Sequence, residues 1–534
     1  MKKTILYLLI INSAIILVSC DKGFEELNKN PFESIETDIG PLFNKVTASL
    51  IQGWNEQFYV NNEALYRYTE LGALTQYAWP NINIGTEEIW TNYYTTLAII
   101  RDIEKRFNDY GGSQDELVNV KAMLKILLAF KTFKVTDLFG DIPFSEAGRG
   151  FESLEYARPS FDSQESIYLF LLDELKWADQ NINAVANPVT PDNVPLYSLA
   201  LYDNLFNGDM LKWRRFANSL RLRYAMRMSN RFPDKAGEII AEIVNGNKLI
   251  ITGTGNDVVM SPAAQGWENN AVNWSFREHG KLRMGETIWN MLSGNNEPDG
   301  SSIFDPRAYI FFETNNAGEW KAFPQIITPD SPTEGGVPYH LHRDNNYPVK
   351  GAACKFSPFN YYLIREEKTI PEILMSVAEV RFILAEAYYR GIGVDQDENM
   401  AKGFYADGVI ASMVFWQNIV KNTSRWVNHE PFLEEWEFYT ALSNPKIDIF
   451  SAPPEKHLKM IYAQRWLDAF RQPAEAYALA RRTMDTPRTG NALAQFRLQY
   501  PDSESLNNNE KWIIQVNKMG GADSQNIKVW WMIP

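Results

Sequence analysis

The chain has 534 residues and a formal net charge of −14 at pH 7, from 52 basic and 66 acidic side chains. Hydrophobic residues make up 45% and aromatic residues 13%, a globular composition that excludes an intrinsically disordered protein. The acidic balance argues against a nucleic-acid partner, because phosphate backbones are bound by basic surfaces.

The first residues have the features of a bacterial lipoprotein leader. Lys2 and Lys3 precede an apolar run over residues 5–18, and Ser19-Cys20 follows. A plain secretory leader would end in an A-x-A-like site, and a run of about 14 apolar residues is shorter than the ~20 that a membrane span needs. The sequence therefore predicts removal of residues 1–19, acylation of Cys20 and a polar tether over residues 20–37. Such a lipid holds a protein on a membrane without crossing it.

Only two cysteines are present, Cys20 and Cys354. If Cys20 carries the lipid, Cys354 has no disulfide partner. We therefore expect the fold to be held by packing.

Helix-length segments follow the tether. In residues 114–139 apolar and small side chains recur at spacings of three and four, which is one face of a helix, and Ser163 with Ser166 is typical of a helix start. The predicted helices of this half lie at residues 39–54, 63–77, 86–108 and 114–139, from Ser163 onward, and at residues 209–231.

The middle of the chain is different, because residues 247–360 are rich in glycine, proline, asparagine and aromatic residues. We expect a short strand at residues 249–252 and helices only at residues 281–292 and 305–312. Helices are predicted again at residues 373–390, 399–419, 431–442, 455–471 and 474–483. The carboxyl terminus is expected to be irregular, with Trp530 and Trp531 close to its end.

Small residues mark the helices that follow the middle region. Ala378, Ala385 and Ala387 precede Gly391, and Ala401 lies on the next helix. Small side chains let antiparallel helices approach closely, as in tetratricopeptide units. The spacing is too irregular to define a repeat, so an ordinary α-helical domain stays open as the alternative.

Catalytic and metal motifs are absent. The chain has no nucleophile elbow, HExxH, P-loop, CxxC or GxGxxG sequence. We interpret His340 and His342 as an incidental pair in a loop, Glu366 and Glu367 as a solvated pair, and Asp141 as a turn residue. The expectation is no enzyme, no metal and no cofactor, although a carboxylate-based hydrolase leaves little local signature and a structural calcium ion stays open.

Tryptophans outside periodic helices are the better indication of function among the 16 in the chain. Flat indoles stack on the apolar faces of sugar rings, while asparagines bind hydroxyls. The predicted ligand-binding residues are Trp79, Asn81, Trp267, Trp274 and Trp320. The alternative is that each indole pins its own loop to the core. Core positions are predicted for the helical tryptophans Trp90, Trp213, Trp289 and Trp466.

Several sequence blocks, spread in order over most of the chain, resemble one known family. They are residues 133–147 (FKVTDLFGDIPFSEA), 158–162 (RPSFD), 208–213 (GDMLKW), 216–227 (FANSLRLRYAMR), 375–391 (MSVAEVRFILAEAYYRG), 462–470 (YAQRWLDAF), 475–477 (EAY), 480–483 (ARRT) and 496–501 (FRLQYP). They are similar to the motifs of the SusD/RagB family of Bacteroidetes outer-membrane lipoproteins, with Ser376-Val377 where the family usually has a tyrosine. We interpret these blocks as structural, so they identify the fold without naming the ligand.

The resemblance implies an all-α fold, a tetratricopeptide-like right-handed helical superhelix with large irregular loop insertions carrying little or no strand. A single domain is expected over residues 38–534, with a helical scaffold at 38–246 and 361–534 and a loop-rich insertion at about 247–360.

The resemblance also implies a function. The protein would be lipid-anchored in the outer membrane, face the cell exterior, and deliver a captured oligosaccharide to a SusC-like TonB-dependent transporter without catalysis. Peptide binding with the same fold and partner is the alternative, and a surface glycan hydrolase is a less favoured one. The family often places an aromatic residue in the loop after its early helices, which makes residues 77–84 the best early candidate region for ligand binding.

Overall fold

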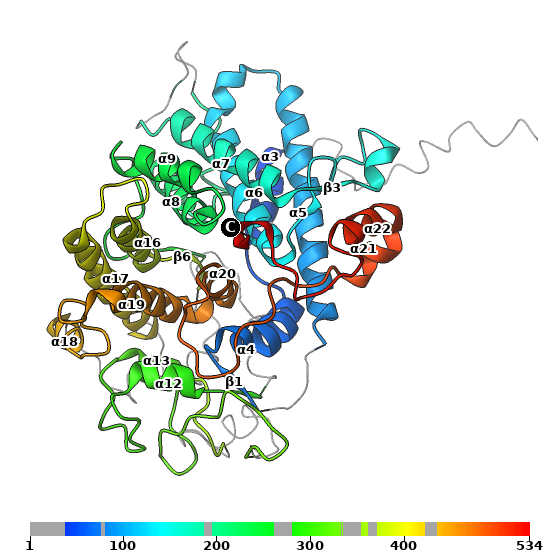
Figure 1. Ribbon diagram of the computed structural model, residues 1–534. Coiled ribbons are helices and arrows are strands. Elements are labelled where there is room, and N and C mark those ends of the chain that lie inside the picture. The colour runs from blue at the N-terminus through cyan, green and yellow to red at the C-terminus, as the bar shows by residue number, and fades with distance from the viewer. Residues whose placement is uncertain are drawn as a thin grey trace, which may run out of the picture.

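The computed structural model describes residues 38–75, 81–185, 189, 195–260, 280–332, 334, 354–360, 371–421 and 435–533, without the side chains of residues 435 and 436. These residues are mostly helical, which confirms the predicted fold class. The helices of the amino-terminal half lie beside those of the carboxyl-terminal half, with α20 between them (Figure 1).

The amino-terminal half begins with two short helices, a ten-residue π-helix and the long helices α5 and α6. Its elements are α3 (Ile39–Ala48), η1 (Glu56–Leu65), α4 (Tyr66–Thr69), β1 (Ala73–Leu74), α5 (Asn83–Asn108), η2 (Gln114–Leu117), α6 (Val118–Phe139), β2 (Ile142–Pro143), η3 (Leu154–Ala157), β3 (Phe161–Asp162), α7 (Gln164–Asn181), α8 (Met210–Met228), α9 (Pro233–Val244) and β4 (Val258–Met260).

The remaining elements start with the short ones of the middle region and end with a helical hairpin. They are β5 (Leu282–Arg283), α12 (Glu286–Leu292), α13 (Arg307–Phe311), β6 (Glu372–Met375), α16 (Val377–Arg390), α17 (Glu398–Lys421), α18 (Glu435–Ala441), α19 (Pro454–Asp468), η5 (Ala469–Arg471), α20 (Pro473–Thr483), α21 (Asp502–Asn507), α22 (Asn509–Lys518) and η6 (Trp530–Met532).

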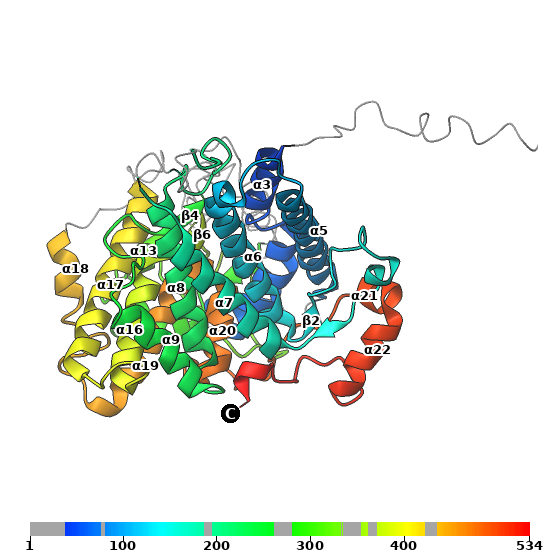
Figure 2. The same cartoon turned by 90° about the horizontal axis from the view of Figure 1, so that it is seen from above.

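Long helices pack against their neighbours in succession. Figure 2 shows α16, α8, α7, α6 and α5 in a row across the molecule, with α21 and α22 at one edge. Helix α6 lies inside this row and is buried on most sides, as a central helix should be. The predicted start of α7 is confirmed, because the Ser163 hydroxyl accepts a hydrogen bond from the Ser166 amide.

Strands are few, and each pairs segments that are distant in sequence. Three antiparallel two-stranded sheets join β1 with β5, β2 with β3, and β4 with β6. A second hydrophobic cluster, containing Trp289, Phe311, Trp416 and Phe470, packs the middle region against α17 and α19. The middle region is thus anchored to the helical scaffold by its own core.

Several predicted elements are wrong. The expected helices at residues 39–54 and 63–77 are replaced by α3, which ends at Ala48, and by η1 and α4. Residues 249–252 form no strand; the strand lies at β4, where β6 supplies its partner. Helix α9 was not expected, and the carboxyl terminus contains α21 and α22 instead of irregular chain.

The buried polar side chains of η1 explain why this helix was not predicted from the sequence. Gln57, Asn61 and Asn62 are buried and bond to one another, with Asn61 Nδ2 3.0 Å from Gln57 Oε1 and Gln57 Nε2 2.8 Å from Asn62 Oδ1. A helix that buries polar side chains has no apolar stripe, so periodicity cannot detect it.

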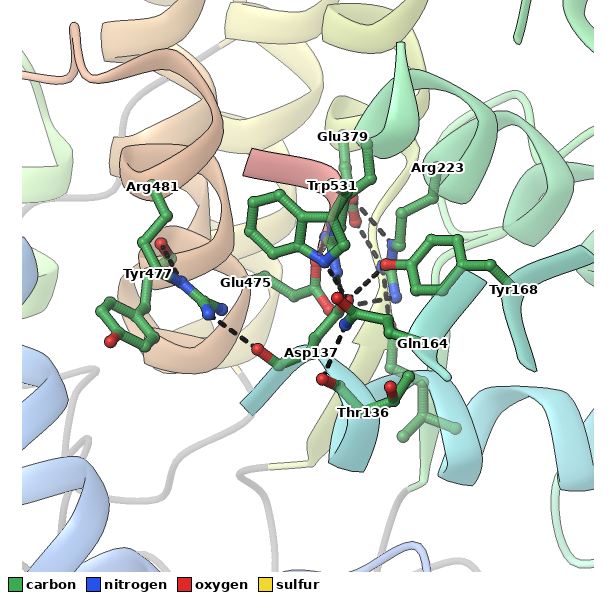
Figure 3. A network of polar contacts seen from close by, with 12 residues as sticks. Thr136, Asp137, Gln164, Tyr168, Arg223, Glu379, Glu475, Tyr477, Arg481 and Trp531 are labelled. Carbon is green, nitrogen blue, oxygen red and sulfur yellow. Dashed lines mark hydrogen bonds and ion pairs between the residues drawn. The ribbon is translucent and has the colours of Figure 1, made fainter. Parts of the chain in front are cut away.

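Buried charges connect helices that are far apart in the chain. Figure 3 shows Tyr168 and the Trp531 indole directed at Asp137 of α6, which accepts hydrogen bonds from both, with the Trp531 Nε1 2.8 Å away. Arg227 donates to this carboxylate as well. Arg227 also pairs with Glu475 of α20. One carboxylate therefore joins α6, α7, α8 and η6, and its arginine extends the network to α20.

The network continues through α16. The Arg223 Nε donates to Glu379 Oε1 at 2.9 Å, and Arg465 of α19 donates to the same oxygen at 3.0 Å. Glu386 accepts two bonds from Arg482, at 2.6 and 2.5 Å. These residues belong to the blocks that resemble the SusD/RagB motifs, and their burial supports a structural role for this part of the blocks.

Replacing Glu386 by glutamine should destabilise the fold, because Arg482 and Arg390 would lose a buried counter-charge. Breaking a buried ion pair typically costs about 3–5 kcal/mol of unfolding free energy. Denaturant unfolding of Glu386→Gln should show a loss of this size. Glu238→Gln is the control, because Glu238 pairs with Lys235 on an exposed surface and should change stability by less than about 0.5 kcal/mol.

The same residue predicts acid sensitivity. Burial acts to raise the pKa of Glu386, but the surrounding arginines, Arg482 first, outweigh it and lower the pKa from 4.5 to about 2. A depressed folded-state pKa gives stability that is present above pH about 4.5 and is lost as pH falls toward 2. Between these values the wild type should lose about 3 kcal/mol that Glu386→Gln does not lose. Equal acid slopes for both proteins would contradict this assignment.

Candidate functional site

Of the five ligand-binding residues predicted from sequence, Asn81 and Trp320 lie in the described part of the chain. Trp79, Trp267 and Trp274 lie outside the described residues, as does Cys20. Asn81 is exposed and lines a hollow, whereas Trp320 is not exposed.

Trp320 is a core residue, and its predicted role in binding is wrong. The side chain is 7% exposed, and its ring stacks on Trp289 with centroids 5.6 Å apart and planes 9° from parallel. The edge of the indole meets Tyr309. The neighbouring Asn315 is also used internally, because its side chain accepts from the amides of Ala317 and Glu319. The alternative reading, an indole that pins its loop to the core, holds here.

The four helical tryptophans are in the core as predicted. Trp90, Trp213, Trp289 and Trp466 are all buried. Asp141 lies in the bend after α6, as predicted, and its side chain accepts from the Gln164 amide at 2.8 Å.

The two sequence regions predicted to carry the site have neighbouring boundaries. Strand β1 pairs with β5, and the Thr75 amide donates to the Lys281 carbonyl at 3.1 Å. Thr75 immediately precedes residues 76–80, and Gly280 immediately follows residues 261–279. One small sheet therefore fixes an end of each region against the other.

A buried ion pair holds a third boundary to the same sheet. Arg283 of β5 is 2.9 Å from Glu334, which also accepts from the Lys355 amide at 2.6 Å. Glu334 and Lys355 lie on either side of the middle-region residues 335–353. The described ends of three segments thus meet at β1 and β5.

Three hollows lie along the polypeptide from α4 to α5. The first, of about 510 Å³, is lined by Tyr68 and Glu70, residues 325–327 and residues 488–495. The second, of about 490 Å³, lies between the start of α5 and the α21–α22 hairpin. The third, of about 630 Å³, lies between α3 and α5. A fourth, of about 520 Å³ among α16, α17 and α18, contains none of the predicted site residues.

The three hollows share walls. The Tyr68 hydroxyl donates to Gln525 Oε1 at 3.1 Å, and these residues line the first and the second hollow. Asn83 lines both the second and the third. Asn81, the one predicted binding residue that lines a described hollow, lies in the second hollow.

Glu70 shapes the first hollow. It adopts a left-handed backbone (φ 60°) and its carboxylate accepts from Thr287, from Arg488 at 2.7 Å and from the Thr489 amide at 2.9 Å. The carboxylate joins α4, α12 and the loop after α20, so its role is to hold the wall in place.

Carboxylates of the third hollow are engaged in the same way. Glu87 accepts from the Ser503 amide at 2.7 Å, and Glu88 accepts from the Glu56 amide at 2.7 Å. Burial raises the pKa of Glu88. Both groups bind backbone amides of neighbouring segments, so the arrangement suits a preformed binding surface and offers no free acid–base pair in the described residues of this hollow.

Trp512 of α22 is a lining residue that the sequence analysis missed. It lines the second hollow together with Asn81, and no ring contact covers it in the described structure. The signal was present, because Asn507, Asn508 and Asn509 precede it and asparagines beside a tryptophan were the pattern sought elsewhere. The stretch was instead read as irregular chain.

Comparison with protein families identifies the chain. A SusD-like family model, described as starch-binding and associating with the outer membrane, matches residues 30–501. The chain belongs to this SusD-like family. Among the residues that the structure describes, none of the helices combines the length and apolar character of a membrane span.

Solved structures share this SusD-like fold. One titled as a chitin-binding protein is 22% identical, with a TM-score of 0.69 over 93% of this chain and 100% of its own. A SusD homologue from Parabacteroides distasonis is 20% identical, with a TM-score of 0.69 over 93% and 98%. Another from Bacteroides vulgatus is 19% identical, with a TM-score of 0.67 over 92% and 97%. No curated protein matches the chain.

Truncating Trp320 should unfold the middle region instead of simply weakening a ligand contact. Removing a buried tryptophan costs about 3–5 kcal/mol. We expect Trp320→Ala to lose stability of this size in denaturant unfolding, and Trp320→Phe to recover part of it. Asn81→Ala is the exposed control and should stay within about 0.5 kcal/mol of the wild type. A Trp320→Ala protein as stable as the wild type would restore this residue as a site candidate.

Proposed function

We propose that this SusD-like protein is a cell-surface lipoprotein that captures oligosaccharide and delivers it to a SusC-like TonB-dependent transporter of the outer membrane. It acts by binding and without catalysis. The family match supports the outer-membrane role, and the leader ending in Cys20 supports lipid anchoring. The resemblance to the SusD/RagB family supports the transporter partner.

The observation that carries the ligand proposal is the meeting of segment ends at β1 and β5. Residues 76–80 and 261–279 contain Trp79, Trp267 and Trp274, and their described boundaries are joined by the Thr75–Lys281 hydrogen bond. Asn81 lies in an adjoining hollow. Loops held on a rigid scaffold are where binding residues usually lie, and aromatic rings with amides suit sugar rings.

The proposed site therefore comprises Trp79, Asn81, Trp267 and Trp274. Two oligosaccharides are natural probes: maltoheptaose, since the family description is starch-binding, and chitohexaose, since a structural relative is titled chitin-binding. A wider neutral glycan array and a peptide mixture complete the set, because peptides were the alternative ligand class.

Alanine at Trp79, Trp267 or Trp274 should weaken oligosaccharide binding. Truncating an aromatic at the centre of a site typically costs about 2 kcal/mol or more, roughly thirtyfold in affinity. Calorimetric titration should show this loss while the melting temperature stays near that of the wild type. Trp177→Ala, a half-buried tryptophan of α7 that lines none of the four hollows, is the matched control. Binding of peptides but of no glycan by the wild type would overturn the oligosaccharide proposal.

Replacing Cys20 by alanine should abolish lipidation, because acylation requires its thiol. Cells grown with a clickable fatty acid should label the wild type and Cys354→Ala, since Cys354 is buried in the fold. Cys20→Ala should carry no label and leave the outer-membrane fraction. Normal labelling and attachment of Cys20→Ala would disprove the lipoprotein assignment.

A further inference from the structure

We propose that the second hollow is a separate subsite for a neutral saccharide ring, with Trp512 of α22 as its stacking platform. This inference rests on the proposed oligosaccharide function and adds a part of the chain that neither the family blocks nor the sequence pattern assigned to binding. The hollow measures about 490 Å³, within the range of about 300–1,000 Å³ that small-molecule sites occupy.

The α21–α22 hairpin, which carries Trp512, is attached to α5 through α21. Asn83 Nδ2 donates to Asp502 Oδ2 at 3.0 Å, and the Asp502 amide donates back to Asn83 Oδ1 at 3.2 Å. Further along both helices, the Trp90 indole donates to Glu504 Oε2 at 3.1 Å. These bonds join α21 to α5 at two levels, so both walls of the hollow are fixed before a ligand arrives. Preorganised walls reduce the ordering cost of binding.

The indole of Trp512 packs against the main hydrophobic core and also reaches a hollow. It is half-buried and is the one described tryptophan among the lining residues of the four hollows. By contrast, Trp320 is covered by Trp289, and Trp54 stacks on Phe58 with centroids 4.7 Å apart. An indole that is supported by the core and lines a hollow can take the apolar face of a pyranose ring.

Free polar atoms surround this indole. The Asn81 Oδ1 accepts a hydrogen bond from the Asn83 amide. The Gln499 Nε2 donates to the Asp523 carbonyl. The Gln525 Oε1 accepts from the Tyr68 hydroxyl. Within the described chain the opposite amide atoms, Asn81 Nδ2, Gln499 Oε1 and Gln525 Nε2, have no protein partner. Two donors and one acceptor therefore remain, and sugar hydroxyls satisfy both kinds.

The charges of the hollow select against anions. Its lining contains two carboxylates, Asp502 and Asp523, and no lysine, arginine or histidine. Arg497 pairs with Asp523, so that arginine is not offered to a ligand. An acidic sugar or a phosphate would meet the carboxylate of Asp502, which accepts from the Asn83 amide group and has no ion-pair partner among the described residues, whereas a neutral ring carries no charge for it to repel. The geometry points to neutral saccharides.

Asn81 belongs both to this hollow and to the site predicted from sequence. An oligosaccharide long enough to occupy the sequence-predicted site and the hollow should bind more tightly than a short one. The test is a calorimetric series of maltooligosaccharides from two to seven rings and of chitooligosaccharides from two to six rings, with the full-length mature protein in detergent. Wild type, Trp512→Ala and the control Trp177→Ala are compared.

Trp512→Ala should reduce affinity for the longest member of the bound series by about tenfold or more. It should leave the affinity for the shortest binding member nearly unchanged. The increase in affinity with oligosaccharide length should therefore be smaller than in the wild type. Trp177→Ala should follow the wild type. Because Trp512→Ala could disturb α22, Ala522→Phe provides a second variant: Ala522 is exposed and lines the hollow, so a phenyl ring there fills it without touching the core.

The subsite would be overturned if Trp512→Ala and Ala522→Phe both fold and both show the same increase in affinity with oligosaccharide length as the wild type. That result would leave the proposed function unaffected. A wild type that binds no member of either series and no neutral glycan on an array would overturn the proposed function and the subsite together. Preferential binding of acidic glycans, weakened by Trp512→Ala, would contradict the assignment to neutral rings.

Discussion

The buried pairing of Asp137 with Arg227 is the constraint on which the rest of the structure depends. A charge inside a protein is stable only when it is paired and hydrogen-bonded, so each member of the pair dictates where the other must lie. Asp137 lies in the last turn of α6, Arg227 lies in the last turn of α8, and Glu475 of α20 completes the triad. Asp137 and Glu475 are labelled in Figure 3. The Trp531 indole then attaches the carboxyl terminus to the same carboxylate. Helices more than 200 residues apart in sequence are placed by one set of charges.

This arrangement separates the scaffold from the surface that binds. The network fills the interior between the two halves, where it fixes α6, α8, α16 and α20 relative to one another. The residues proposed for binding belong to other segments, and the described hollows with their lining amides lie near β1, the start of α5 and the α21–α22 hairpin. A rigid frame with exposed loops allows the loops to vary in chemistry without disturbing the frame. The motif blocks therefore identify the family, whereas the ligand must be inferred from the hollows.

The elements that were predicted correctly are those whose signals lie within a few neighbouring residues. The apolar periodicity of α6 and the serine cap of α7 are encoded within a few residues, and both were found. The π-helix η1 was missed because Gln57 and Asn61 are polar yet buried. Helices α21 and α22 are short and take their position from contacts with α5, such as the Asn83–Asp502 pair, which no sequence window contains. Strand β4 was not located for the same reason, because its partner β6 is more than 110 residues away. Helix α9 did have a local signal, since Pro233 begins it and Ala236, Ile239, Ile240 and Ile243 recur at spacings of three and four, and the prediction overlooked that signal.

The candidate site could be addressed only in part. Asn81 lines a hollow and its binding role stays a prediction. Trp320 could not be told from an exposed indole, because its partner Trp289 lies 31 positions away and only folding brings the rings together. Trp512 was missed for the opposite reason: asparagines precede it, as in the pattern sought, but the carboxyl terminus was expected to be irregular. Stacking partners are a tertiary property, so a tryptophan beside asparagines remains ambiguous until its neighbours in space are known.

Hydrogen–deuterium exchange with and without bound oligosaccharide tests the central claim most directly, because it locates the ligand without altering the protein. Saturating maltoheptaose or chitohexaose, whichever binds, should slow exchange in peptides covering residues 71–86, 261–285 and 499–525. Peptides from α16, α17 and α18 should exchange at unchanged rates. Protection confined to those three helices, or no protection anywhere at saturation, would contradict a saccharide site at β1, β5 and the start of α5.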